Sequence, residues 1–98
     1  MNVKARIRWQ SPSEGGRNLP PCGPKYSTVA RFPEDEANWP DKVWSLVLEW
    51  QTTQTPEWEM VADVHFLVSE APQELLHEGA VFKLYEGHKC VAVGEVIA

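Results

Sequence analysis

The sequence predicts an all-β domain, an antiparallel barrel or sandwich of about six strands. Several segments alternate apolar and polar residues with a period of two, which is typical of a strand with one buried face. The connections between them are rich in Gly, Pro and polar residues, which interrupt a hydrogen-bonded ladder. Only residues 69–79 have a helix-like pattern. There we expect at most one short helical turn, which starts at Pro72 and ends at Gly79.

The expected strands follow one another in chain order. The first has the clearest pattern, because the apolar residues from Val3 to Trp9 share one face and Lys and Arg residues occupy the other. A long loop, residues 11–24, follows it, and such loops in small domains are often functional. The last two strands form a hairpin with a three- or four-residue connection at Glu86-Gly87-His88, where glycine supplies a positive φ. The six strands are expected at residues 3–10, 26–32, 43–50, 58–68, 80–85 and 89–97.

The five tryptophans have different expected roles. Trp9, Trp44 and Trp58 fall on the apolar faces of alternating segments, so we expect them in the core. Trp50 ends a strand and could be buried or exposed. Trp39 lies in an acidic loop, where it either anchors a partner or folds back to cap the barrel.

The charges divide unevenly along the chain. Nine Lys and Arg stand against fourteen Asp and Glu, a net charge of −5. Residues 1–31 hold six of the basic residues and one acid, a net charge of +5, which leaves −10 for the rest. We interpret this asymmetry as a clue to partners rather than to the fold. The basic residues expected to contact phosphates or an acidic surface are Arg6, Arg8, Arg17 and Lys25.

No catalytic, cofactor or metal site is expected. Cys22 and Cys90 fit no zinc spacing, and two free thiols are expected for a cytosolic chain. The three histidines lack the spacing of metal ligands, and no Ser or Cys lies in a nucleophile signature. The sequence therefore indicates a protein that is not an enzyme.

Length and hydropathy exclude further classes. The 98 residues fit one domain, residues 1–98, and leave no room for a dinucleotide-binding fold or a GTPase domain. No stretch approaches the ~20 apolar residues that a membrane-spanning helix needs, so we expect no membrane partner. The N-terminus has no apolar signal region, which predicts a cytoplasmic location.

Two separated motifs point to one family. After the first strand comes Ser13-Glu14-Gly15-Gly16-Arg17, with Pro20 three residues beyond the Arg, and a glycine then precedes Lys25. Near the C-terminus lies the block Glu78–Gly94, which reads EGAVFKLYEGHKCVAVG. Together they resemble the C-terminal β-barrel domain, the third domain, of bacterial elongation factor Tu. The likeness runs in order over nearly the whole chain except residues 33–57, and it implies a single six-stranded antiparallel barrel.

The resemblance also implies a set of partner-binding residues. In that family the domain binds no nucleotide, and together with its partner domains it contacts the T-stem of aminoacyl-tRNA. Glu86 matches a position that contacts the T-stem, and Gly87 matches its neighbour. Arg17 and Lys25 match basic positions near the tRNA. The sequence departs from the family where His88 replaces the second hairpin glycine and Lys89 replaces the following arginine.

These observations lead to two functional hypotheses. The first is a translation-related, non-enzymatic binding module that engages a protein or tRNA-like RNA through residues 11–25 and the last hairpin. The second is a protein-only adaptor, which docks on a GTPase or an exchange factor through the acidic loop 34–41 and Trp39. A closed barrel has no free sheet edge, so a monomer is expected.

Overall fold

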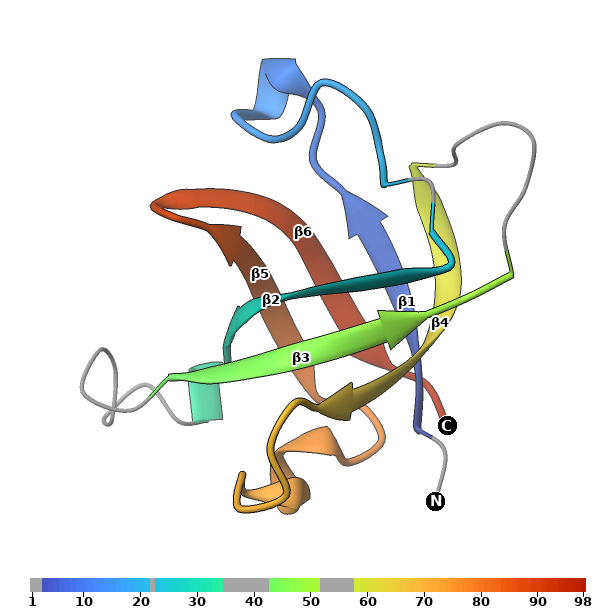
Figure 1. Cartoon of the computed structure of the whole chain (residues 1–98), viewed down its shortest axis with the longest axis vertical. Coiled ribbons are helices and arrows are strands. Elements are labelled where there is room, and N and C mark those ends of the chain that lie inside the picture. The colour runs from blue at the N-terminus through green and yellow to red at the C-terminus, as the bar shows by residue number, and fades with distance from the viewer. Residues whose placement is uncertain (1–2, 22, 35–42, 52–57) are drawn as a thin grey trace.

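All six alternating segments form strands in the computed structural model, which describes residues 3–21, 23–34, 43–51 and 58–98 (Figure 1). The strands pair antiparallel in the order β1-β4-β3-β2-β5-β6, and β6 pairs back onto β1, so the sheet closes into a barrel. The predicted six-stranded antiparallel barrel is thus confirmed, and the sandwich is excluded. The strands are β1 (Val3–Trp9), β2 (Lys25–Arg31), β3 (Trp44–Glu49), β4 (Glu59–Phe66), β5 (Val81–Glu86) and β6 (Lys89–Val96).

The inward positions of the alternating pattern fill the barrel. Ile7, Leu46, Leu48 and Leu84 are completely buried. The centroid of the Phe32 ring lies 5.7 Å from that of Phe66 and 5.6 Å from that of Phe82. Gly94 of β6 faces the Phe82 ring so closely that a Cβ there would overlap it. Each buried aromatic or aliphatic side chain of this size contributes roughly 1.5–3 kcal/mol to folding.

Two expectations at the fourth strand are wrong. The strand covers eight residues rather than 58–68, and Trp58 is 38 % exposed instead of buried in the core. Val68, at the end of the expected strand, is 43 % exposed. Trp58 precedes the ladder at a rim where the rings of Trp9 and Trp50 already fill the interior. Val68 follows the point where β4 ends and the chain turns, with the Ala71 N–H donating to the Val68 carbonyl at 3.3 Å.

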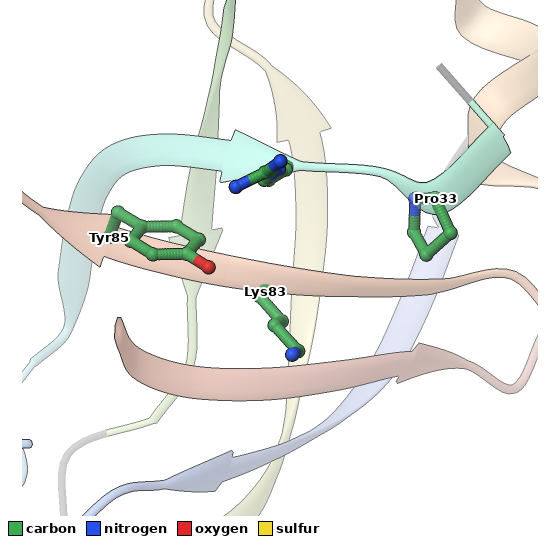
Figure 2. Close-up of a pocket in the computed structure, with 4 residues that line it drawn as sticks. Pro33, Lys83 and Tyr85 are labelled. Carbon is green, nitrogen blue, oxygen red and sulfur yellow. The ribbon is translucent and has the colours of Figure 1, made fainter. Parts of the chain in front are cut away.

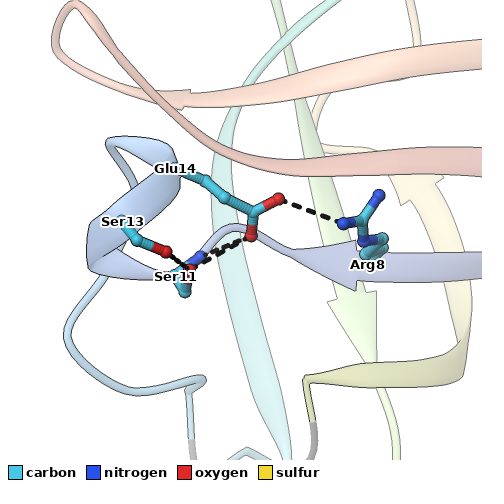
Figure 3. Close-up of polar contacts among 4 residues, drawn as sticks. All are labelled: Arg8, Ser11, Ser13 and Glu14. Carbon is cyan, nitrogen blue, oxygen red and sulfur yellow. Dashed lines mark hydrogen bonds and ion pairs between the residues drawn. The ribbon is translucent and has the colours of Figure 1, made fainter.

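Two 3-10 turns lie wholly within the described part of the chain, and Pro33 and Glu34 also have a 3-10 conformation, whereas one turn was expected. The expected one is η3 (Gln73–Leu76), which follows Pro72 and buries two leucines. The other is η1 (Pro12–Glu14), at the start of the long loop. Its carboxylate, Glu14, accepts from the Ser11 N–H at 3.1 Å and from the Arg8 guanidinium at 3.0 Å (Figure 3). The Ser-x-x-Glu pattern is a helix-start signal and could have predicted this turn.

Candidate partner-binding end of the barrel

The loop after β1 folds back over the end of its own strand. The Gln10 N–H donates to the Val91 carbonyl at 2.8 Å, and the Arg17 N–H donates to the Gln10 carbonyl at 2.8 Å. Gly16 lies so close to the Gln10 backbone that no Cβ would fit there. This close approach holds residues 11–17 beside the β5–β6 hairpin, at the upper end of the barrel in Figure 1.

A cluster of three side chains joins the loop, β2 and the hairpin. The Arg17 guanidinium forms an ion pair with the Glu86 carboxylate, and the Tyr26 hydroxyl donates to the same carboxylate oxygen. The guanidinium carbon of Arg17 also lies 5.5 Å from the centroid of the Tyr26 ring. Arg17 Nε donates to the Leu19 carbonyl at 3.0 Å, which fixes the next part of the loop. Two of the predicted partner-binding residues, Arg17 and Glu86, therefore bind each other.

The pKa values in this cluster follow from its partial burial. Burial opposes ionisation of Glu86, but the Tyr26 hydrogen bond and the positive charge of Arg17 outweigh it, so the pKa of Glu86 falls below its usual range. Burial and the neighbouring carboxylate raise the pKa of Tyr26. At neutral pH the cluster is therefore an ionised carboxylate held by a guanidinium and a neutral phenol.

The remaining predicted hairpin residues lie at its exposed tip. Glu86 pairs with Lys89, so the connection is a two-residue turn of Gly87 and His88 rather than the expected three or four residues. Gly87 has a φ of 65°, which confirms the expected positive φ. The side chains of His88 and Lys89 and the backbone of Gly87 can reach a partner without rearrangement of the barrel, since all three residues are exposed.

Lys25 lies apart from the cluster, although it is next to Tyr26 in β2. It is exposed on the outward face and stands opposite Glu49 of β3. Trp39 lies outside the described residues, as does the rest of the acidic loop except Glu34. The Glu34 carboxylate lies 2.6 Å from Nε2 of His77, and both side chains are exposed.

The basic residues of β1 are paired with carboxylates, mostly from the acidic part of the chain. Lys4 lies 2.9 Å from Asp63, and the Arg6 guanidinium lies 3.8 Å from Glu95. Each of these pairs is about half exposed and contributes little to stability on its own. Their effect is electrostatic, because both predicted phosphate contacts on β1 are neutralised, Arg6 by Glu95 across the ladder and Arg8 by Glu14 of the following turn.

Cys90 is a free, partly buried thiol that donates to the Ala92 carbonyl at 3.5 Å, and Cys22 lies outside the described residues. Within residues 3–21, 23–34, 43–51 and 58–98, no three His, Cys, Asp or Glu side chains are grouped as metal ligands. In the same ranges no helix is both long and apolar enough to cross a membrane.

No protein-family model matches this sequence, and a search of curated proteins finds no match.

Sequence reasoning missed Tyr26 as a member of the site and Leu19 as an exposed apolar residue beside it. Leu19 is 65 % exposed, the highest value among the exposed large hydrophobic residues of the described chain. Its place in a Gly- and Pro-rich loop gives no periodicity from which exposure could be read. The pairing of Tyr26 with Glu86 spans 60 residues and has no local signal.

Proposed function

We propose that the chain is a non-enzymatic binding module, similar to the third domain of elongation factor Tu but acting without a GTPase domain. Its partner docks on the end of the barrel formed by residues 11–25 and the β5–β6 hairpin. The observation that carries this proposal is the Arg17–Glu86 ion pair, which joins two motifs 69 residues apart into one surface. Those are the same two motifs on which the family resemblance rests.

The contacts favour a protein over an RNA as the partner. Arg17 is already bound to Glu86, and an RNA phosphate would have to displace that carboxylate to reach it. Leu19, beside Arg17, offers an exposed apolar side chain of the kind that anchors protein interfaces. The exposed His88 and Lys89 at the hairpin tip then form the polar rim of the same surface.

A pair of leucine substitutions tests the docking surface. Leu19→Asp places a charge at the proposed interface, and Leu67→Asp is the matched control, because Leu67 is 59 % exposed and follows β4 at the opposite end of the barrel. In affinity purification of the tagged chain from its source cells, we expect a protein partner that Leu19→Asp loses by about tenfold and Leu67→Asp retains.

Two results would contradict the proposal. Equal recovery of every partner by the two variants would show that this end of the barrel is not the interface. Recovery of RNA instead of protein, together with salt-dependent anisotropy on labelled tRNA, would replace the protein partner with an RNA.

A further inference from the structure

A surface pocket of about 250 Å³, the Trp58 pocket, lies between the end of β1, the turn that follows it and the start of β4. It is lined by Arg8, Trp9, Ser11, Glu14, Trp58 and Glu59. Two of these residues, Ser11 and Glu14, belong to the loop on which the partner is proposed to dock. The volume is below the roughly 300–1,000 Å³ of small-molecule sites, so the pocket suits one side chain of a partner.

The Trp58 pocket combines an aromatic ring with a carboxylate. The indole of Trp58 is 38 % exposed, whereas Trp9 is buried. The Trp9 N–H donates to the Trp58 carbonyl at 2.7 Å, which holds the backbone of Trp58 against the end of β1. The next residue is Glu59, which is also exposed. An aromatic face and a carboxylate are two of the groups that bind organic cations in proteins.

The charged side chains of this pocket have an excess of one carboxylate. The Arg8 guanidinium lies 3.0 Å from Glu14, whose other oxygen accepts from the Ser11 N–H (Figure 3). Glu59 is the ladder partner of Arg8, but among the residues that the structure describes Glu59 forms no ion pair. The lining thus has two acids and one base, and one incoming cation balances its net charge of −1.

Two other surface pockets have a different balance of charge. Figure 2 shows a pocket of about 430 Å³ at β2 and β5, lined by Arg31, Pro33, Lys83 and Tyr85. Its charged residues in the described chain are both basic. Another pocket, of about 230 Å³, is lined from β1, β4, β5 and β6 and has two arginines and two glutamates. Of the three, the Trp58 pocket alone has an acidic excess among the residues that the structure describes.

We propose that the Trp58 pocket binds the guanidinium group of an arginine side chain of the partner. The planar guanidinium stacks on the indole of Trp58, and its N–H groups donate to the Glu59 carboxylate. A lysine ammonium suits the pocket less well, because it lacks the planar fork of donors and is more strongly hydrated. This inference rests on the proposed docking of a protein at this end of the barrel, and it adds the chemistry by which that protein is recognised.

Titration with two matched probes tests the pocket. N-acetyl-arginine amide and N-acetyl-citrulline amide are added separately to the ¹⁵N-labelled chain at constant ionic strength, and amide and indole shifts are followed by NMR. Citrulline keeps the shape of arginine without its charge. We expect saturable shifts concentrated around Arg8, Ser11 and Trp58 with the arginine probe, and binding of the citrulline probe that is weaker by about fivefold or more. The absence of saturable shifts, or equal binding of the two probes, would overturn the proposal.

Two glutamate variants identify the carboxylate. Glu59→Gln should weaken binding of the arginine probe by about fivefold, because the charge-assisted contact is lost. Glu49→Gln, at an exposed glutamate of β3 outside the pocket, should leave the binding unchanged. Binding that persists in Glu59→Gln, or that falls equally in both variants, would overturn the proposal. An unchanged melting temperature of Glu59→Gln excludes unfolding as the cause.

Capture of the partner from source cells separates this inference from the function on which it rests. Glu59→Gln should lose the partner by about fivefold, and Glu49→Gln should retain it. Full recovery by Glu59→Gln together with loss by Leu19→Asp would overturn the arginine pocket and leave the docking surface in place. Full recovery by Leu19→Asp would overturn the docking surface and, with it, the assignment of the arginine to the partner.

Discussion

Removing the Tyr26 hydroxyl is the sharpest test of the cluster that joins the loop to the hairpin. Tyr26→Phe keeps the ring against Trp9, where the two centroids are 5.2 Å apart, and deletes only the hydrogen bond to Glu86. A hydrogen bond to a charged group is worth about 1.5–3 kcal/mol. Because the Glu86 side chain is 34 % exposed, solvent screens part of this, and we expect a loss of about 1–2 kcal/mol.

The assay is urea unfolding at pH 7, followed by tryptophan fluorescence. For a chain of 98 residues, 1 kcal/mol corresponds to roughly 4–8 °C in Tm, so thermal unfolding gives an independent value. Arg6→Gln is the control, because the Arg6–Glu95 pair is exposed at 3.8 Å and should cost less than about 0.5 kcal/mol.

The pH dependence of the same variant separates the hydrogen bond from packing. The pKa of Glu86 is lower in the folded chain than its ordinary value, so its ionised form stabilises the fold above the unfolded pKa. That stability is lost as the pH falls through the lowered folded pKa. The difference between the wild-type chain and Tyr26→Phe should therefore shrink in acid. A difference no larger than that of Arg6→Gln at pH 7, or one that is constant with pH, would refute the reasoning.

Two further predictions concern the core and an exposed histidine. Gly94→Ala should destabilise the barrel by about 1–3 kcal/mol in urea unfolding, because the new methyl group overlaps the Phe82 ring, and an unchanged midpoint would contradict this packing. The pKa of His77 should be raised in an NMR titration, through its hydrogen bond to the Glu78 carbonyl and its pairing with Glu34, and Glu34→Gln should lower it toward the ordinary value. A pKa of His77 that does not respond to Glu34→Gln would show that this pair does not form in solution.

The sequence predicted the strands well because each strand of a barrel has its own alternation of apolar and polar residues in the local sequence. Residues that alternate with period two bury one face wherever both neighbours are strands, and the inward set from Ala5 to Trp9 is buried as expected. The failures lie at strand ends. In the sequence, Trp58 continues the alternation of β4. Whether a side chain at the rim of the barrel is buried depends on which side chains from other strands fill that end of the interior, and the local sequence pattern does not contain this information.

The candidate site was predictable in its members but not in its geometry. Arg17 and Glu86 were each expected to contact a partner, on the basis of two motifs treated separately. In the barrel they bind each other, because β1 runs next to β6 and the loop that follows it reaches the hairpin tip. A contact across 69 residues is set by topology, which periodicity alone does not determine.

The topology also explains why the charge division along the chain does not become a division in space. Ladder closure places β1, which carries much of the basic excess, between β4 and β6, which belong to the acidic part. Opposite charges then face each other, as Lys4 and Asp63 do. The three cations of β1 are therefore each paired with a carboxylate, and they do not form one uncompensated basic surface.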